Sequence, residues 1–177
     1  TVPANTVIHT DRVADTSIGL YYRVRALNGV GLSGYSNEAM AIATPEWRLA
    51  AGGLHSLLIG FDGSLWAWGS NGAGQLGDGT TTTRTLPTPV LPGVTAMAAE
   101  LEHTLALTDD GSLWAWGDNL VGQLGDGTTT SRHRPTQILP GVAATAAGYE
   151  HSLALKTDGS LWAWGWNASG QIGDGTT

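Results

Sequence analysis

The amino-acid sequence predicts an all-β protein of repeated four-stranded units, and three observations lead to this prediction. The phrase GSLWAWG begins at Gly63, Gly111 and Gly159, so each copy starts 48 residues after the last. Each copy contains short apolar runs, and 26 glycines among 177 residues suit tight turns better than long helices. The apolar runs are nearly continuous, which indicates strands covered on both faces. Such units are what the blades of a β-propeller require.

The second copy shows the four expected strands most clearly. They are VTAMAA from Val94, HTLALT from His103, SLWAWG from Ser112 and PTQIL from Pro135. Asp110-Gly111 separates the second strand from the third, and this pair favours a two-residue type I′ turn with positive φ at both positions. The copies cover about residues 45–91, 92–139 and 140–177, and the last is incomplete. The sequence therefore predicts about three blades of an incomplete β-propeller.

The repeated motif W-x-W-G-x-N-x-x-G-Q-L-G-D-G, with H-[ST]-L upstream and P-T-x-x-L downstream, resembles the regulator-of-chromosome-condensation repeat family. The resemblance implies a propeller of usually seven blades, so the remaining blades would lie in a longer protein of which this chain is a fragment. We expect the repeated tryptophans to pack blade against blade and the repeated glycines to form turns. These structural positions are Gly63, Trp66, Trp68, Gly111, Trp114, Trp116, Gly159, Trp162 and Trp164.

Residues 1–45 predict a different domain from residues 46–177. An alternating strand is centred on Tyr22, Val24 and Ala26, and a second strand follows a Gly-rich turn, from about Asn37 to Ala43. This spacing looks like the last hairpin of a fibronectin type III domain, a β-sandwich of about 100 residues. Residues 1–45 would then be a partial fibronectin type III sandwich containing its last strands. The alternative is an irregular N-terminal cap.

Composition excludes several classes of function. The formal net charge of −7, with only eight Lys and Arg, argues against nucleic acid as a partner because phosphate binding needs clustered basic residues. The absence of Cys excludes disulfides, thiolate nucleophiles and Cys-based zinc sites. No apolar run reaches the length of about 18 residues needed to span a membrane.

Two sets of polar residues recur in register, namely His55, His103 and His151, and Asp78, Asp126 and Asp174. Imidazole is a common metal ligand, but each histidine begins the same strand of a different unit, which predicts packing or hydrogen bonding. The aspartates lie in Gly-Asp-Gly-Thr, and one carboxylate per repeat cannot supply the six to eight oxygens of a calcium site. We expect them to bond backbone amides in turns. The sequence thus predicts no catalytic residue, metal or cofactor.

Positions that differ between the copies are the better candidates for recognition, and Tyr, Trp and Arg are enriched at binding hot spots. The candidates are Tyr149, Glu150, Trp166, Arg132, His133 and Arg134. We expect a non-catalytic module that binds a protein or surface polymer and belongs to a larger, bacterial extracellular or surface protein. The alternatives are guanine-nucleotide exchange on a small GTPase, as the family resemblance allows, and an accessory domain of an enzyme.

Overall fold

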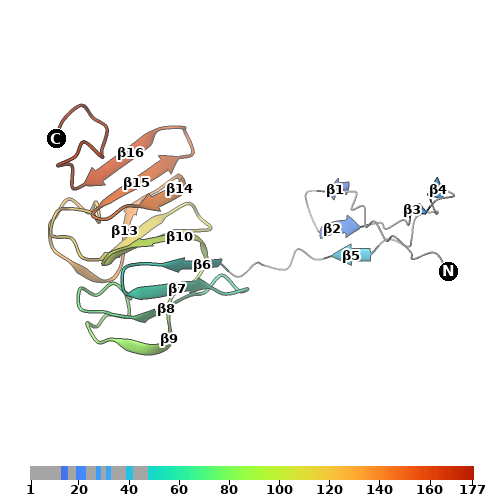
Figure 1. Ribbon diagram of the computed structural model, residues 1–177, viewed down its shortest axis with the longest axis horizontal. Helices are drawn as coiled ribbons and strands as arrows, with labels where there is room; N and C mark the ends of the chain where they lie inside the picture. Colours follow the sequence, from blue (N-terminus) through green and yellow to red (C-terminus); the bar gives the residue numbers. More distant parts are fainter. Residues whose placement is uncertain (1–12, 16–18, 23–26, 29–30, 33–38, 42–47) are drawn as a thin grey trace. The chain divides into compact units, whose positions relative to one another are not determined.

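The computed structural model describes residues 13–15, 19–22, 27–28, 31–32, 39–41 and 48–177. The chain divides into two units, Thr1–Pro45 and Glu46–Thr177 (Figure 1). Every helix or strand assigned to these described residues is a β-strand. Within the described ranges, no helix has the length and apolar character needed to span a membrane.

The described residues of the first unit form five short strands, which are β1 (Val13–Asp15), β2 (Gly19–Tyr22), β3 (Leu27–Asn28), β4 (Gly31–Leu32) and β5 (Ala39–Ala41). Strands β1, β2 and β5 form one sheet in that order, and β3 pairs with β4. The antiparallel pairing of Tyr21 with Met40 joins the two segments that the sequence predicts as a hairpin. Val24 and Ala26 lie outside the described residues, and these strands do not identify a fibronectin type III sandwich.

The second unit consists of three antiparallel sheets in chain order, which we call blades 1, 2 and 3 (Figure 1). Blade 1 is β6 (Arg48–Ala51), β7 (His55–Ile59), β8 (Leu65–Gly69) and β9 (Arg84–Leu91). Blade 2 is β10 (Val94–Glu100), β11 (His103–Thr108), β12 (Leu113–Gly117) and β13 (Arg132–Leu139). Blade 3 is β14 (Val142–Ala147), β15 (His151–Lys156) and β16 (Leu161–Gly165). The predicted strands are confirmed, although β13 begins at Arg132 and therefore earlier than expected.

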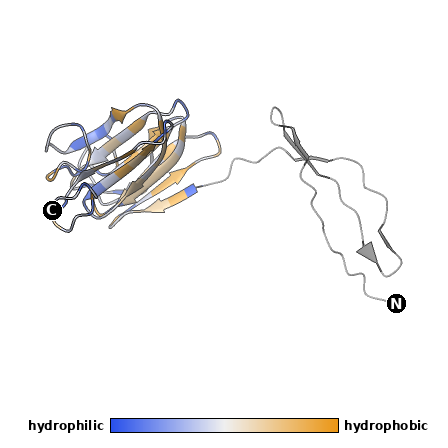
Figure 2. Ribbon diagram, turned by 90° about the horizontal axis from the view of Figure 1, so that it is seen from above, coloured by the Kyte–Doolittle hydropathy of each residue, from blue (hydrophilic) through white to orange (hydrophobic). Residues whose placement is uncertain are grey.

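The hydrophobic core lies between the blades. The face that a blade turns toward the next blade is here called its leading face, and the opposite face is its trailing face. Leu57, Leu65 and Ala67 on the leading face of blade 1 pack against Ala106 and Trp116 on the trailing face of blade 2. The same arrangement repeats between blades 2 and 3, around Leu105, Leu113, Ala115, Ala154 and Trp164. Figure 2 shows that the hydrophobic segments of this unit lie mainly along its strands.

The Asp-Gly turns differ from the predicted type I′ form. Gly111 has φ of 77°, as expected, but among the described residues only glycines have positive φ, so Asp110 does not. Gly111 N donates to Thr108 O at 2.9 Å, and Thr108 N donates to Ser112 O at 3.0 Å. These bonds define a three-residue loop, a turn over Asp109 and Asp110 followed by one left-handed glycine. The type I′ prediction is therefore wrong, because the turn begins one residue earlier than a two-residue loop would.

Candidate functional site

Each blade has two different ends. One end carries the tight Asp-Gly turns, and the other carries the turns at residues 52–54, 101–102 and 148–150 together with the loops at 70–83, 118–131 and 166–177. We call the second the long-loop end. There the two stretches that differ most between copies meet, because Trp166 N donates to Glu150 O at 2.8 Å. Asp118 N donates to Glu102 O at 2.9 Å in the same way in blade 2.

One asparagine organises each long loop, and in blades 1 and 2 this residue is fully buried. In blade 2, Asn119 is fully buried, and its Oδ1 accepts a hydrogen bond from Leu124 N at 2.9 Å. Its Nδ2 donates to Asp126 Oδ1 at 3.1 Å and to the carbonyl of Thr130 at 3.1 Å. Asn71 in blade 1 makes the equivalent bonds. The loop is therefore fixed from inside by its own polar residues.

The repeated aspartates close the loops as turn residues. Thr128 N donates to Asp126 Oδ1 at 2.9 Å, and Arg132 forms an ion pair with Asp126 Oδ2 at 2.6 Å. Burial raises the pKa of Asp126, but hydrogen bonds from Thr128, Arg132 and Asn119 outweigh it and lower the pKa to about 2. Asp78 repeats the ion pair with Arg84, also at 2.6 Å. The turn role expected for these aspartates is confirmed.

The repeated histidines join neighbouring blades. His55 Nε2 lies 3.0 Å from Thr104 Oγ1 in the next blade, and His103 Nε2 lies 3.1 Å from Ser152 Oγ. Thr104 Oγ1 donates to the carbonyl of Gln75 at 2.9 Å. Since the hydroxyl proton is used there, Nε2 of His55 is the donor to Thr104. The hydrogen-bonding role expected for the histidines is confirmed for both blade junctions.

A tryptophan completes each junction. Trp116 Nε1 of blade 2 donates to the carbonyl of Gln75 in blade 1 at 2.9 Å, and Trp164 Nε1 donates to the carbonyl of Gln123 at 2.9 Å. We call this set of four groups the blade latch. Between blades 1 and 2 it consists of His55, the hydroxyl of Thr104, the carbonyl of Gln75 and Trp116. Between blades 2 and 3 the same roles belong to His103, Ser152, Gln123 and Trp164. A Cβ at Gly77 would lie 2.7 Å from Trp116 Nε1, so only glycine permits the indole to approach. These contacts assign a packing role to Trp116 and Trp164.

Burial keeps the latch histidines neutral. Desolvation lowers the pKa of His55 to about 4. It also lowers the pKa of His103 to about 4, with a smaller contribution from His55 and an opposing one from Asp118. Nδ1 of His55 is buried without a hydrogen-bond partner in the described part of the chain. The histidines therefore act as hydrogen-bond donors in a buried junction, not as acid–base groups at neutral pH.

The structure places three of the predicted binding residues together at the long-loop end of blade 3. Tyr149 is 60% exposed and Trp166 is 43% exposed, and the bond from Trp166 N to Glu150 O ties the two segments together. Oε2 of Glu150 is buried and has no hydrogen-bond partner among the described residues. The result is a pair of exposed aromatic side chains beside an acidic residue.

The other three predicted binding residues lie at the start of β13. Arg132 is held by Asp126, as Arg84 is held by Asp78, which gives Arg132 a structural role. His133 O accepts a hydrogen bond from Gly79 N in blade 1 at 2.8 Å. Gly74 lies against His133, and Gly79 lies against the guanidinium of Arg134. His133 and Arg134 therefore belong to blade 2 but contact the long loop of blade 1, and both remain exposed.

Sequence models of known repeats match most of the second unit. One regulator of chromosome condensation (RCC1) repeat model matches residues 62–107 and 110–155, which together exceed half of the chain. The chain belongs to the RCC1 repeat family. A second RCC1 repeat model matches residues 48–75, 94–123 and 142–171. The resemblance inferred from the W-x-W-G motif is thereby confirmed.

Solved structures show the same fold. Human WBSCR16 is 22% identical with a TM-score of 0.63, over 85% of this chain and 43% of that one. Yeast RCC1 (Prp20), in a complex with Kap60, is 22% identical with a TM-score of 0.65, over 99% of this chain and 48% of that one. A second structure of Prp20p from Saccharomyces cerevisiae is 21% identical with a TM-score of 0.65, over 99% and 50%. This chain spans about half the length of these proteins, and the likeness shows the fold.

Two groups of residues in the RCC1 blades have structural roles that the sequence did not predict, and one of these groups includes Arg132, which was predicted to bind a partner. The hydroxyls of Thr104 and Ser152 in the latch were visible only as the [ST] that follows each repeated histidine. Arg84 and Arg132 also fall in register, a signal that they share one role. In both cases, the only indication in the sequence was that the same residue type recurs at the same position of each copy.

Proposed function

We propose that residues 46–177 act as a non-catalytic binding module and that the long-loop end of blade 3 contacts a protein partner. The observation that carries the proposal is the exposure of Tyr149 and Trp166, at 60% and 43%, on loops fixed from inside. Most of the repeated side chains described above are engaged in the latch or the loops. RCC1-type propellers typically mediate protein binding, and exposed aromatic anchors on a rigid support are typical of hot spots.

The chain fits a larger extracellular or cell-surface protein. Its sequence contains no Cys, and the proposal of a fibronectin type III-like sandwich before the propeller rests on the sequence spacing of residues 20–43 alone. Repeated blades suit display of a binding face. The partner is then a protein on the same or a neighbouring surface. The described residues give no feature that favours guanine-nucleotide exchange.

Site-specific photo-cross-linking tests the proposal. A photoreactive phenylalanine is placed at position 149, at position 166 or, as a control, at Thr157, which is exposed in the Asp-Gly turn of the same blade. The protein is then illuminated in its natural host. We expect one discrete adduct from positions 149 and 166 and none from position 157. Equal labelling from all three positions, or none from 149 and 166, would contradict the proposal.

The cross-linked partner then allows a quantitative measurement. Tyr149→Ala and Trp166→Ala should each weaken its binding by about 30-fold, which corresponds to roughly 2 kcal/mol. Thr157→Ala should leave binding unchanged. All three variants should keep the wild-type melting temperature, because none of these side chains is buried.

A further inference from the structure

Blade 2 carries two exposed apolar side chains and two carboxylates at its long-loop end. Leu120 is 74% exposed and Val121 is 40% exposed, at positions where blade 1 has Gly-Ala and blade 3 has Ala-Ser. The carboxylates belong to Glu102 and Asp118, at positions where blade 1 has Leu and Ser and blade 3 has Glu and Trp. We call these four residues the blade 2 tip.

Hydrogen bonds join the members of the blade 2 tip to one another. Asp118 N donates to Glu102 O at 2.9 Å, and Gln123 Nε2 donates to Asp118 Oδ2 at 2.7 Å. Val121 N in turn donates to Gln123 Oε1 at 3.1 Å. In blade 1, where a serine replaces the aspartate, Nε2 of the equivalent Gln75 is buried without a partner among the described residues. The tip therefore has a fixed backbone and a fixed Asp118 carboxylate.

The loop does not need these four side chains in order to fold. Leu76 N donates to Asn71 Oδ1 at 3.0 Å in blade 1, and Ile172 N donates to Asn167 Oδ1 at 2.9 Å in blade 3. Both bonds repeat the one that Asn119 makes in blade 2. Since small residues at the tip of blades 1 and 3 give the same loop, the apolar and acidic residues of blade 2 are free to serve recognition.

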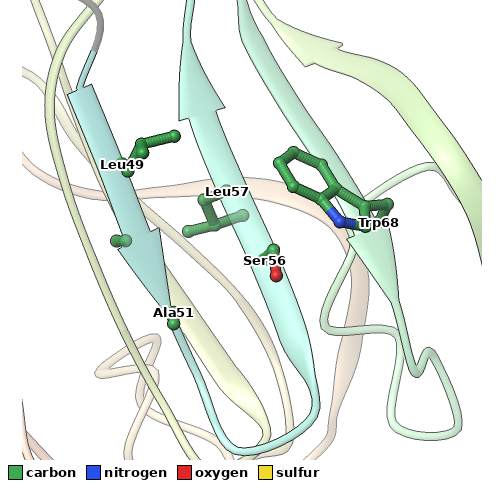
Figure 3. Close-up of a pocket in the computed structure, with 6 residues that line it drawn as sticks. Leu49, Ala51, Ser56, Leu57 and Trp68 are labelled. Carbon is green, nitrogen blue, oxygen red and sulfur yellow. The ribbon is translucent and has the colours of Figure 1, made fainter.

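The exposure of the blade 2 tip is that of a blade with both of its neighbours in place. Other exposed apolar side chains lie on outer faces, such as Leu49 beside Ser56 and Trp68, which line a cavity of about 370 Å³ on blade 1 (Figure 3). That face has no neighbouring blade within residues 48–177. Blade 2 packs against blade 1 on one side and against blade 3 on the other, so its tip is exposed for a different reason.

The blade 2 tip adjoins the exposed aromatic pair of blade 3. The carbonyl of Gln123 accepts a hydrogen bond from Ser152 Oγ of blade 3 at 2.8 Å. A Cβ at Gly165 would lie 2.5 Å from Glu150 O and 3.2 Å from Cα of Gln123. The loop that carries the tip therefore lies beside the turn that carries Tyr149, and the two form one continuous surface.

The charge of this surface is negative. The side-chain hydrogen bonds to Asp118 come from neutral groups, Gln123 and Ser131, which leave its charge uncompensated. Arg132 bonds the same loop, but its charge is balanced by Asp126 at 2.6 Å. Within residues 48–177, neither Glu102 nor Asp118 forms an ion pair. A partner that complements the surface is positively charged, since like charges at an interface disfavour binding.

We propose that the blade 2 tip binds a basic polypeptide segment that also carries apolar side chains. Lys or Arg side chains of the segment lie beside Glu102 and Asp118, and its apolar side chains contact Leu120 and Val121. The inference rests on the proposed function, to which it adds the chemistry of the partner. Nucleic acid or an anionic lipid surface would meet like charge at this end of the blade.

A phage-displayed library of short random-sequence peptides, selected on the 177-residue chain, tests the proposal. Parallel selections use Glu102→Lys and a matched control, Asp109→Lys, which changes the net charge equally at the opposite end of the same blade and is also exposed. We expect the wild type and Asp109→Lys to enrich peptides with Lys or Arg next to apolar residues, and Glu102→Lys to lose that enrichment. No enrichment on the wild type, or equal loss in both variants, would overturn the proposal.

Fluorescence anisotropy with one peptide selected on the wild type measures the size of the effect. Glu102→Lys and Leu120→Ser should each weaken its binding about tenfold, because one reverses a complementary charge and the other removes an apolar contact. Asp109→Lys should bind like the wild type, and added salt should weaken the wild type more than Glu102→Lys. All three variants should melt like the wild type, since these side chains are exposed. Unchanged binding by Glu102→Lys would contradict the assignment.

Photo-cross-linking in the natural host separates this inference from the proposed function. Adducts from positions 149 and 166 that Glu102→Lys and Leu120→Ser leave undiminished would overturn the role of the blade 2 tip and leave the contact at blade 3 standing. Peptide binding that depends on Glu102 and Leu120, without any adduct from positions 149 and 166, would support the tip and overturn the contact at blade 3.

Discussion

At the scale of single residues, glycine and asparagine determine how the RCC1 loops are built. Gly111 is needed for its backbone, because φ of 77° is a region that side chains with a Cβ rarely adopt. Gly77 is needed for its lack of a side chain, because Trp116 occupies the space. Asn119 is needed because its amide group both donates and accepts hydrogen bonds. It thereby connects two parts of the loop, the amide of Leu124 and the carbonyl of Thr130.

Gly111→Val should lower the free energy of unfolding by about 1–3 kcal/mol, because a β-branched residue is strained at positive φ. The nearest atom to a Cβ at this position would be 3.7 Å away, so the cost comes from the backbone and not from a clash. Urea denaturation measures the loss. Gly111→Asn is the control, since asparagine tolerates the left-handed region, and it should cost clearly less. Equal stability of the valine variant and the wild type would contradict the turn geometry.

The residue scale also shows where sequence reasoning failed. Asp110-Gly111 fits both a two-residue type I′ turn and a three-residue loop that ends in a left-handed glycine. The two differ only in whether Asp109 belongs to the strand or to the turn, and the sequence contains no residue that decides this. The hydrogen bond from Gly111 N to Thr108 O decides it in the structure.

At the scale of elements, the strands were predictable because their apolar runs repeat three times with Gly-rich turns between them. The start of β13 was not predictable, because Arg132 and His133 are polar and precede Pro135. Their strand conformation depends on pairing with β12, where Gly117 faces Arg132. The contact between Trp166 and Glu150 was not predictable either, because it is a backbone hydrogen bond between two separate loops. The prediction of six binding residues remains a prediction.

The blade latch makes stability depend on pH. The pKa of His55 and of His103 is about 4 in the folded protein and 6.5 when unfolded. Between these values the unfolded chain binds protons that the folded chain does not, so stability is complete above pH 6.5 and falls as the pH is lowered. The slope in this window approaches about 1.4 kcal/mol per pH unit for each histidine.

Urea midpoints measured from pH 7.5 to 4.5 test this dependence. The aspartates of the loops, whose pKa values are lowered from 3.8, contribute below this window. His55→Gln combined with His103→Gln should be less stable at neutral pH and should lose most of the slope. An unchanged slope in that double variant would show that other groups cause the acid sensitivity.

At the scale of the whole molecule, the sequence repeat and the blade are out of phase. Residues 62–107, which match one RCC1 repeat, contain β8 and β9 of blade 1, β10 of blade 2 and all of β11 except its last residue. Each repeat therefore crosses a junction and carries residues from both of its sides.

The central claim is that the repeated residues join one blade to the next, and a double-mutant cycle between His55 and Thr104 tests it most directly. His55→Ala and Thr104→Val are measured singly and together by urea denaturation at neutral pH. The 3.0 Å bond between the two side chains predicts a coupling energy of about 0.5–3 kcal/mol. His55→Ala with Ser152→Ala, which lies in the other junction, should be additive. Additivity within about 0.3 kcal/mol for His55 and Thr104 would contradict the latch.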